Sequence, residues 1–135
     1  MHHTAQMLQT HPHPRPSALA DIADCIDALQ TCTQSCISCA DADLGEPESQ
    51  MLTRCVRLNL DCADVCVTMA RLLSRPSMIE PEIWIAQLQA CIAACRACAQ
   101  ECQQHAQHHE HCRMCADTCR ECIAACTDVL DMIRH

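Results

Sequence analysis

The sequence has almost no aromatic residues, little glycine and no excess of positive charge. Of its 135 residues one is tryptophan and one is glycine, and it has no tyrosine or phenylalanine. The formal net charge of -8 argues against nucleic acid or an anionic membrane as a partner, because such surfaces attract basic patches. No run approaches 18 consecutive apolar residues, so no membrane-spanning helix is predicted. The N-terminal residues lack the basic and apolar regions of a signal peptide, and we therefore expect a cytoplasmic protein.

Cysteine is unusually abundant, with 16 in the chain, whereas aromatic residues are scarce. Aromatic side chains normally dominate the energetics of a core, so another residue type must fill the interior here. Many cysteines indicate either disulfides or metal ligands. Disulfide scaffolds are secreted and rich in irregular loops, whereas this chain has one glycine and regularly spaced cysteines. Metal binding is therefore the favoured interpretation.

The fold class that we predict is all-α, an antiparallel four-helix bundle with a Cys-lined core. Residues 1–16 are expected to form a flexible N-terminal tail, because their prolines disfavour a helix, and residues 17–135 to form the bundle domain. Expected helices cover about 17–42 and 47–73, with Ser17 as the first N-cap. Residues 77–80 have the form of a capping box that opens the third helix, and the third and fourth helices should meet within 103–110.

Within each expected helix the cysteines are separated by steps of three, four or seven residues. Such steps place side chains on one face of a helix, at the positions that leucines hold in an ordinary bundle. Four stripes should therefore converge on the bundle axis. The cysteines are Cys25, Cys32, Cys36 and Cys39, then Cys55, Cys62 and Cys66, then Cys91, Cys95, Cys98 and Cys102, and finally Cys112, Cys115, Cys119, Cys122 and Cys126.

Two residue-level alternatives stay open. A free cysteine is a comfortable small core residue, so any single one could be purely structural. Asn59 lies on the same face as Cys55 and Cys62 and is either a hydrogen-bonded core amide or an auxiliary metal ligand.

Charge and donor type favour Cu(I) as the bound metal. Zinc tetrathiolate sites each carry two net negative charges, and burying several along one dry axis is costly. Cu(I) matched one to one with thiolates is neutral, and soft thiolates select it. An iron–sulfur cluster would leave most of the cysteines unused. The CxxC pairs lack the βαβ context of a thioredoxin-like site, and no catalytic constellation is present, so we do not expect an enzyme.

The two ends of the expected bundle differ. One end is expected to be an apolar plug made of Leu19, Ile22, Met69, Leu72, Leu73, Ile83, Trp84, Leu88, Val129, Leu130 and Ile133. The other end, which we call the mouth, gathers Asp43 and Cys112 with the candidate metal ligands Met51, His105, His108, His109 and His111. Imidazole and thioether groups both bind Cu(I), so metal is expected to pass through this end.

The longest motif resembles the copper storage proteins, and in particular their cytosolic branch. It reads Cys91-x3-Cys95-x2-Cys98-x3-Cys102-x2-His105-x3-His109-x-His111-Cys112-x2-Cys115-x3-Cys119-x2-Cys122-x3-Cys126. The resemblance implies a four-helix bundle that fills with many Cu(I) ions, assembles as a homotetramer and serves as a cytoplasmic reservoir. Copper ions, and the copper chaperones or chelators that carry them, are the implied partners. The alternatives are a zinc or general metallothionein-like buffer and a structural bundle with an incidental thiol core.

Overall fold

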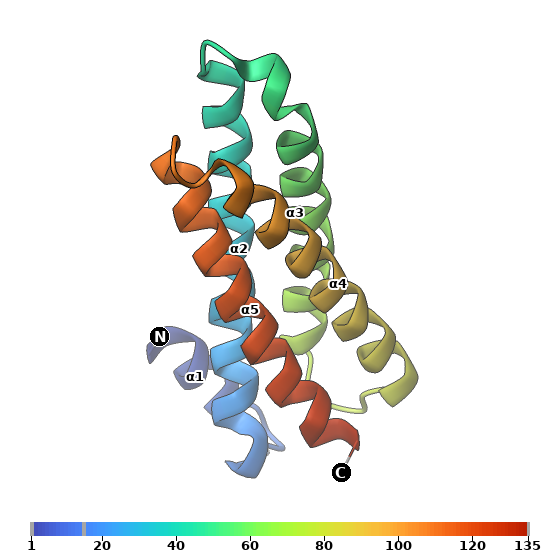
Figure 1. Cartoon of the computed structure of the whole chain (residues 1–135). Helices are drawn as coiled ribbons and strands as arrows, with labels where there is room; N and C mark the ends of the chain where they lie inside the picture. The colour runs from blue at the N-terminus through green and yellow to red at the C-terminus, as the bar shows by residue number, and fades with distance from the viewer. Residues whose placement is uncertain (1, 15, 135) are drawn as a thin grey trace.

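Four long helices form an up-and-down bundle in the computed structural model, which describes residues 2–14 and 16–134 (Figure 1). They are α2 (Pro16–Gly45), α3 (Thr53–Leu73), α4 (Pro81–His105) and α5 (Glu110–Arg134). Each helix packs against the next around the bundle, and α5 closes the ring against α2. The predicted all-α four-helix architecture is confirmed, and within the described ranges there is no strand. None of the described helices is long and apolar enough to cross a membrane.

The predicted N-terminal caps of two helices are wrong. Helix α2 begins at Pro16, so Ser17 lies inside its first turn instead of capping it. Proline is well tolerated there, since its missing N–H has no partner in a first turn anyway. Helix α4 begins at Pro81 with Glu80 as N-cap and no side-chain cap bond. The predicted capping box fails because Met78, within it, has a left-handed φ of 53°, which a right-handed helix cannot include.

The N-terminal segment contains a short helix where we expected a flexible tail. Helix α1 (His2–Gln9) lies beside the first half of α2 (Figure 1). Leu8 packs against the core, and the Thr4 hydroxyl donates a 2.6 Å hydrogen bond to Asp27. Such a short helix is marginal alone, so these contacts explain why composition did not reveal it. Met1, Arg15 and His135, which belong to the predicted domain ranges, lie outside the described residues.

The connection between α2 and α3 contains a 3₁₀ turn, η1 (Ser49–Leu52), where a continuous α-helix from residue 47 was expected. A 3₁₀ turn has three residues per turn, which changes which side chain faces inward. Leu52 is consequently buried at 1% exposure, whereas Met51 is 74% exposed. The inward position that spacing assigned to Met51 is therefore wrong.

The plug end is apolar, as expected. Met69, Leu73, Leu88 and Val129 have no exposed surface, and Trp84 is 4% exposed. Ile83 is 55% exposed and does not belong to the plug, since it precedes Trp84 by one residue and so points elsewhere on the helix. The remaining predicted plug residues are Leu19, Ile22, Leu72, Leu130 and Ile133, all buried or partly buried. Outside this plug a hollow of about 580 Å³ is bordered by Trp84, among other residues.

Candidate metal centre

The cysteine side chains form a column along the bundle axis. All 16 are buried, with at most 1% of any one exposed. Each of the four long helices contributes a stripe, as the spacing of three and four residues predicts. The mouth is the end of the column at which α2 joins α3 and α4 joins α5.

The sulfur atoms are close neighbours but are not bonded to each other. Hydrogen-bonded Sγ pairs range from 3.6 Å, for Cys62 and Cys95, to 4.0 Å, for Cys32 and Cys36. A disulfide would bring the two sulfurs to about 2.05 Å. The column therefore consists of free thiols that can each offer a sulfur to a metal.

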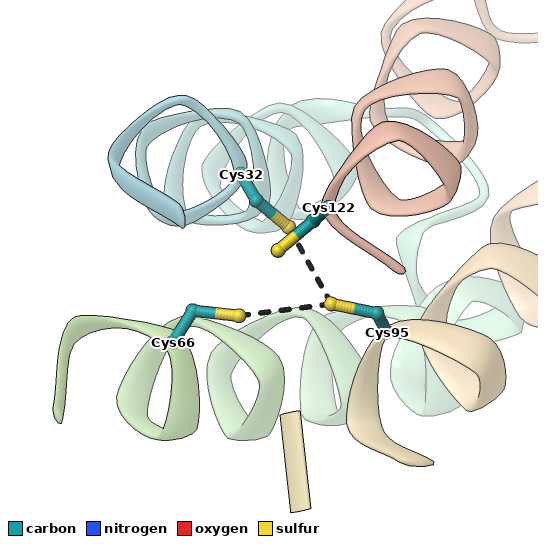
Figure 2. Close-up of side chains that lie close together, drawn as sticks. All are labelled: Cys32, Cys66, Cys95 and Cys122. Atoms are coloured by element: carbon teal, nitrogen blue, oxygen red, sulfur yellow. Dashed lines mark hydrogen bonds between the residues drawn. The ribbon is translucent and has the colours of Figure 1, made fainter. Parts of the chain in front are cut away.

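Four helices supply one sulfur each to the group shown in Figure 2. Cys32, Cys66, Cys95 and Cys122 point toward a common centre, and their Sγ atoms all lie within 4.8 Å of one another. Cys95 Sγ lies 3.7 Å from that of Cys66 and 3.9 Å from that of Cys32. Residues distant in sequence therefore build one soft, buried donor set.

Neighbouring groups of this kind share members. Cys32 also belongs to a group with Cys36, Cys62 and Cys119, and Cys36 to a further group with Cys98, Cys115 and Cys119. A third set, nearer the mouth, joins Cys39, Cys102 and Cys115. Thiolates can bridge ions in such overlapping sets, which suits clusters of a metal that accepts two or three sulfurs.

Mutual hydrogen bonding shifts the pKa values of neighbouring thiols in opposite directions, so some thiols favour the neutral form while partners such as Cys126, whose pKa is lowered by hydrogen bonds, favour the thiolate. The thiol of Cys25 donates a hydrogen bond to Cys126, and this bond together with burial raises the pKa of Cys25 above its usual range. Because metal ligands must be deprotonated, uptake of each ion by such thiols releases protons.

Asn59 is the polar residue within the column. Its Oδ1 accepts hydrogen bonds from Cys98 at 3.0 Å and Cys115 at 3.3 Å, and its Nδ2 donates to Cys55 at 3.7 Å. The amide is thus fully buried and hydrogen-bonded. The same geometry places an oxygen donor beside two sulfurs, so both sequence-based interpretations of Asn59 fit its surroundings.

At the mouth a mixed donor set replaces the all-sulfur groups. Cys39, Asp43, His111 and Cys112 present ligand atoms that lie within 4.8 Å of one another. His111 Nδ1 is 3.4 Å from Cys39 Sγ, 3.6 Å from Cys112 Sγ and 3.5 Å from Asp43 Oδ1. Two sulfurs, a nitrogen and an oxygen therefore converge where the column approaches solvent.

Asp43 is a member of this set that sequence analysis placed at the mouth but did not identify as a ligand. It is completely buried, and its Oδ2 has no hydrogen-bond partner. Burial is the main cause that raises the pKa of Asp43 to about 7. Its position four residues after Cys39, on the same helical face, was the signal that could have identified it.

The other predicted mouth residues have different surroundings. His105 Nε2 is 2.9 Å from Glu101 Oε2. His109 lies between Glu46 and Glu48 and stacks on His111, with ring centroids 5.4 Å apart. The structure does not bring His108 or Met51 to the site, since both are exposed.

Residues 18–131 match the family model described as copper storage protein. The chain belongs to the copper storage protein family. This match spans the whole column, from Cys25 to Cys126, and confirms the resemblance found in the longest motif. Helix α1 lies outside the matched residues.

Solved structures of a family member agree with the fold. The copper storage protein Ccsp from Streptomyces lividans, loaded with 10 copper equivalents, is 43% identical with a TM-score of 0.91, covering 95% of this chain and 98% of that one. A structure described as a cytosolic copper storage protein from the same organism, with five coppers, is 46% identical with a TM-score of 0.81, covering 83% and 93%. The uncharacterized cysteine-rich protein YhjQ of Bacillus subtilis (strain 168) is 33% identical over 102 residues, 76% of this chain and 89% of that protein.

Proposed function

We propose that this copper storage family member holds many Cu(I) ions as thiolate clusters along its axis. The observation that carries the proposal is the column of 16 free, buried thiols arranged in overlapping groups. Repeated soft donor sets suit storage, because a catalytic site needs one set and a place for substrate. One structure of the Streptomyces lividans relative is described as loaded with 10 copper equivalents.

Anaerobic titration of the reduced protein with Cu(I), and separately with Zn(II), tests this function. We expect about one Cu(I) or more per thiol, because Cu(I) can share bridging sulfurs. Saturation at about four Zn(II), with weaker uptake of Cu(I), would instead support the zinc-buffer alternative, because each zinc ion prefers four sulfur ligands. Metal per chain is measured by elemental analysis after desalting.

The route of uptake is also part of the proposal. The plug is sealed by fully buried aliphatic side chains, whereas His111 is 25% exposed and contacts both Cys39 and Cys112. Copper from a chaperone or a small chelator would therefore first meet the mixed donor set and then pass to the thiols.

We expect His111→Ala to slow loading of the first equivalents by about tenfold or more while final capacity stays close to that of the parent protein. The thiols hold most of the metal, which is why capacity should change little. His108→Ala is the matched control, because that histidine is exposed and is not part of the mixed donor set. Stopped-flow absorbance of the thiolate–copper bands measures the rate, and equal rates in the two variants would contradict this route.

A cytosolic location and a homotetrameric assembly complete the proposal. The location is supported by the description of the Streptomyces lividans relative as cytosolic. Exposed Ile37, Leu60 and Val67 on the outer faces of α2 and α3 offer apolar area for contact between copies. Sedimentation equilibrium of the reduced protein measures the assembly.

A further inference from the structure

His111 has a different environment on each side of its ring. On the inner side, Nδ1 lies 3.4 Å from Cys39 Sγ, 3.6 Å from Cys112 Sγ and 3.5 Å from Asp43 Oδ1, an oxygen that already accepts a hydrogen bond from the Cys112 thiol. On the outer side, Nε2 lies 2.9 Å from the Oε2 atom of Glu46. The ring therefore joins the buried thiols to a carboxylate at the surface.

The partners of the two nitrogens are not equivalent in hydrogen bonding. An ionised carboxylate can only accept, so a neutral imidazole that bonds to Glu46 must carry its proton on Nε2. Thiols can donate, and they face the nitrogen that then has the free lone pair. The lone pair is what a metal ion needs, and carboxylates that hold the other ring nitrogen orient ligating histidines in many metal sites.

Glu46 is itself held in place by its local backbone. Its N–H donates to the Asp43 carbonyl at 3.2 Å, and its own carbonyl accepts from Ser49 at 3.1 Å. The carboxylate also contacts His109 Nδ1 at 3.2 Å, and that ring stacks on His111. These contacts fix the carboxylate on the outer side of His111.

His109 lacks the same asymmetry. Its Nδ1 faces Glu46 and its Nε2 lies 2.9 Å from Glu48 Oε1. Both ring nitrogens of His109 therefore face surface carboxylates, whereas His111 Nδ1 faces two sulfurs. The two stacked histidines thus have separate roles, one facing the column and the other bracing Glu46.

We propose that Glu46 is a positioning residue that holds His111 in its Nε2–H tautomer, so that the Nδ1 lone pair faces Cys39 and Cys112. Glu46 acts through His111 and needs no contact with the metal. The consequence for loading rests on the proposed uptake route, but the tautomer can be measured on metal-free protein.

The first test measures the His111 tautomer by ¹⁵N chemical shifts of the imidazole nitrogens in reduced, metal-free protein. We expect the Nε2–H form in the parent and in Glu46→Gln, which keeps an acceptor oxygen, and a mixture of tautomers in Glu46→Ala. Glu110→Ala is the control, because this carboxylate also lies at the mouth but bonds to Arg113 instead of an imidazole. A parent ring with its proton on Nδ1, or on both nitrogens, overturns the proposal, as does a tautomer that Glu46→Ala leaves unchanged.

The second test follows loading of the first Cu(I) equivalents in the same variants, with circular dichroism to confirm that each is folded. We expect Glu46→Ala to slow this phase by about tenfold, Glu46→Gln to restore most of the rate, and Glu110→Ala to match the parent. A changed tautomer with an unchanged rate would overturn the positioning role. A parent protein that binds few Cu(I) ions at all would instead refute the storage function, and the tautomer measurement would still stand.

Discussion

Trp84→Ala should lower the free energy of unfolding of the reduced, metal-free protein by about 3 kcal/mol or more. Trp84 is 4% exposed and is the one aromatic side chain in the chain. Its removal leaves a void among plug residues that are already fully packed. The hollow outside the plug lets water reach part of that void, which places the cost at the lower end of the usual range for a buried tryptophan.

Chemical denaturation followed by circular dichroism measures this cost. Ile83→Ala is the matched control, since Ile83 is adjacent in sequence but 55% exposed, and it should cost less than about 1 kcal/mol. Equal effects at the two positions would show that the plug does not depend on Trp84. Copper capacity should stay unchanged in both variants, because neither residue contributes a sulfur.

Asp43→Asn should make the metal-free protein more stable at neutral and higher pH, by up to about 4 kcal/mol. Burial raises the pKa of Asp43 from 3.8 to about 7. Between these values the unfolded chain has released the proton while the folded chain still holds it, so the parent loses stability as pH rises through this window. Below about pH 4 both states are protonated, and asparagine should then resemble the neutral acid.

Unfolding at a series of pH values from 4 to 8 tests this prediction. Asp41→Asn is the control, because it removes the same charge from the same helix at an exposed position and so separates net charge from burial. A stability gain at Asp43 that does not grow with pH would contradict the assignment of a buried, unfavourable carboxylate at the mouth.

The cysteine column could be predicted from sequence because one physical rule fixes it. Helical periodicity places residues at steps of three and four on one face, and cysteine is chemically distinct enough to make that face visible. Inside a regular helix the spacing alone determines which face a side chain occupies, so Cys91 and Cys126 lie where the spacing places them. The family motif depends on the same regularity.

The mouth could not be predicted to the same depth because it lies where the helices stop being regular. The 3₁₀ turn before α3 changes which side chain faces inward, and Leu52 takes the position expected for Met51. The contribution of Asp43 and Glu46 to the site at the mouth depends on their contacts with α5, which is distant in sequence. An acidic residue near a helix end otherwise looks like an ordinary solvated one.

The column is closed at the plug, and its neighbouring groups share cysteines. This arrangement affects the order in which copper ions enter and leave. An ion bound by shared thiols can move to the next group without returning to water. Where the mouth is the one passage, ions that arrive first come to rest deepest, and those that arrive last leave first. Each molecule would then hold a quickly exchanged fraction near His111 and a slow reserve near Cys25.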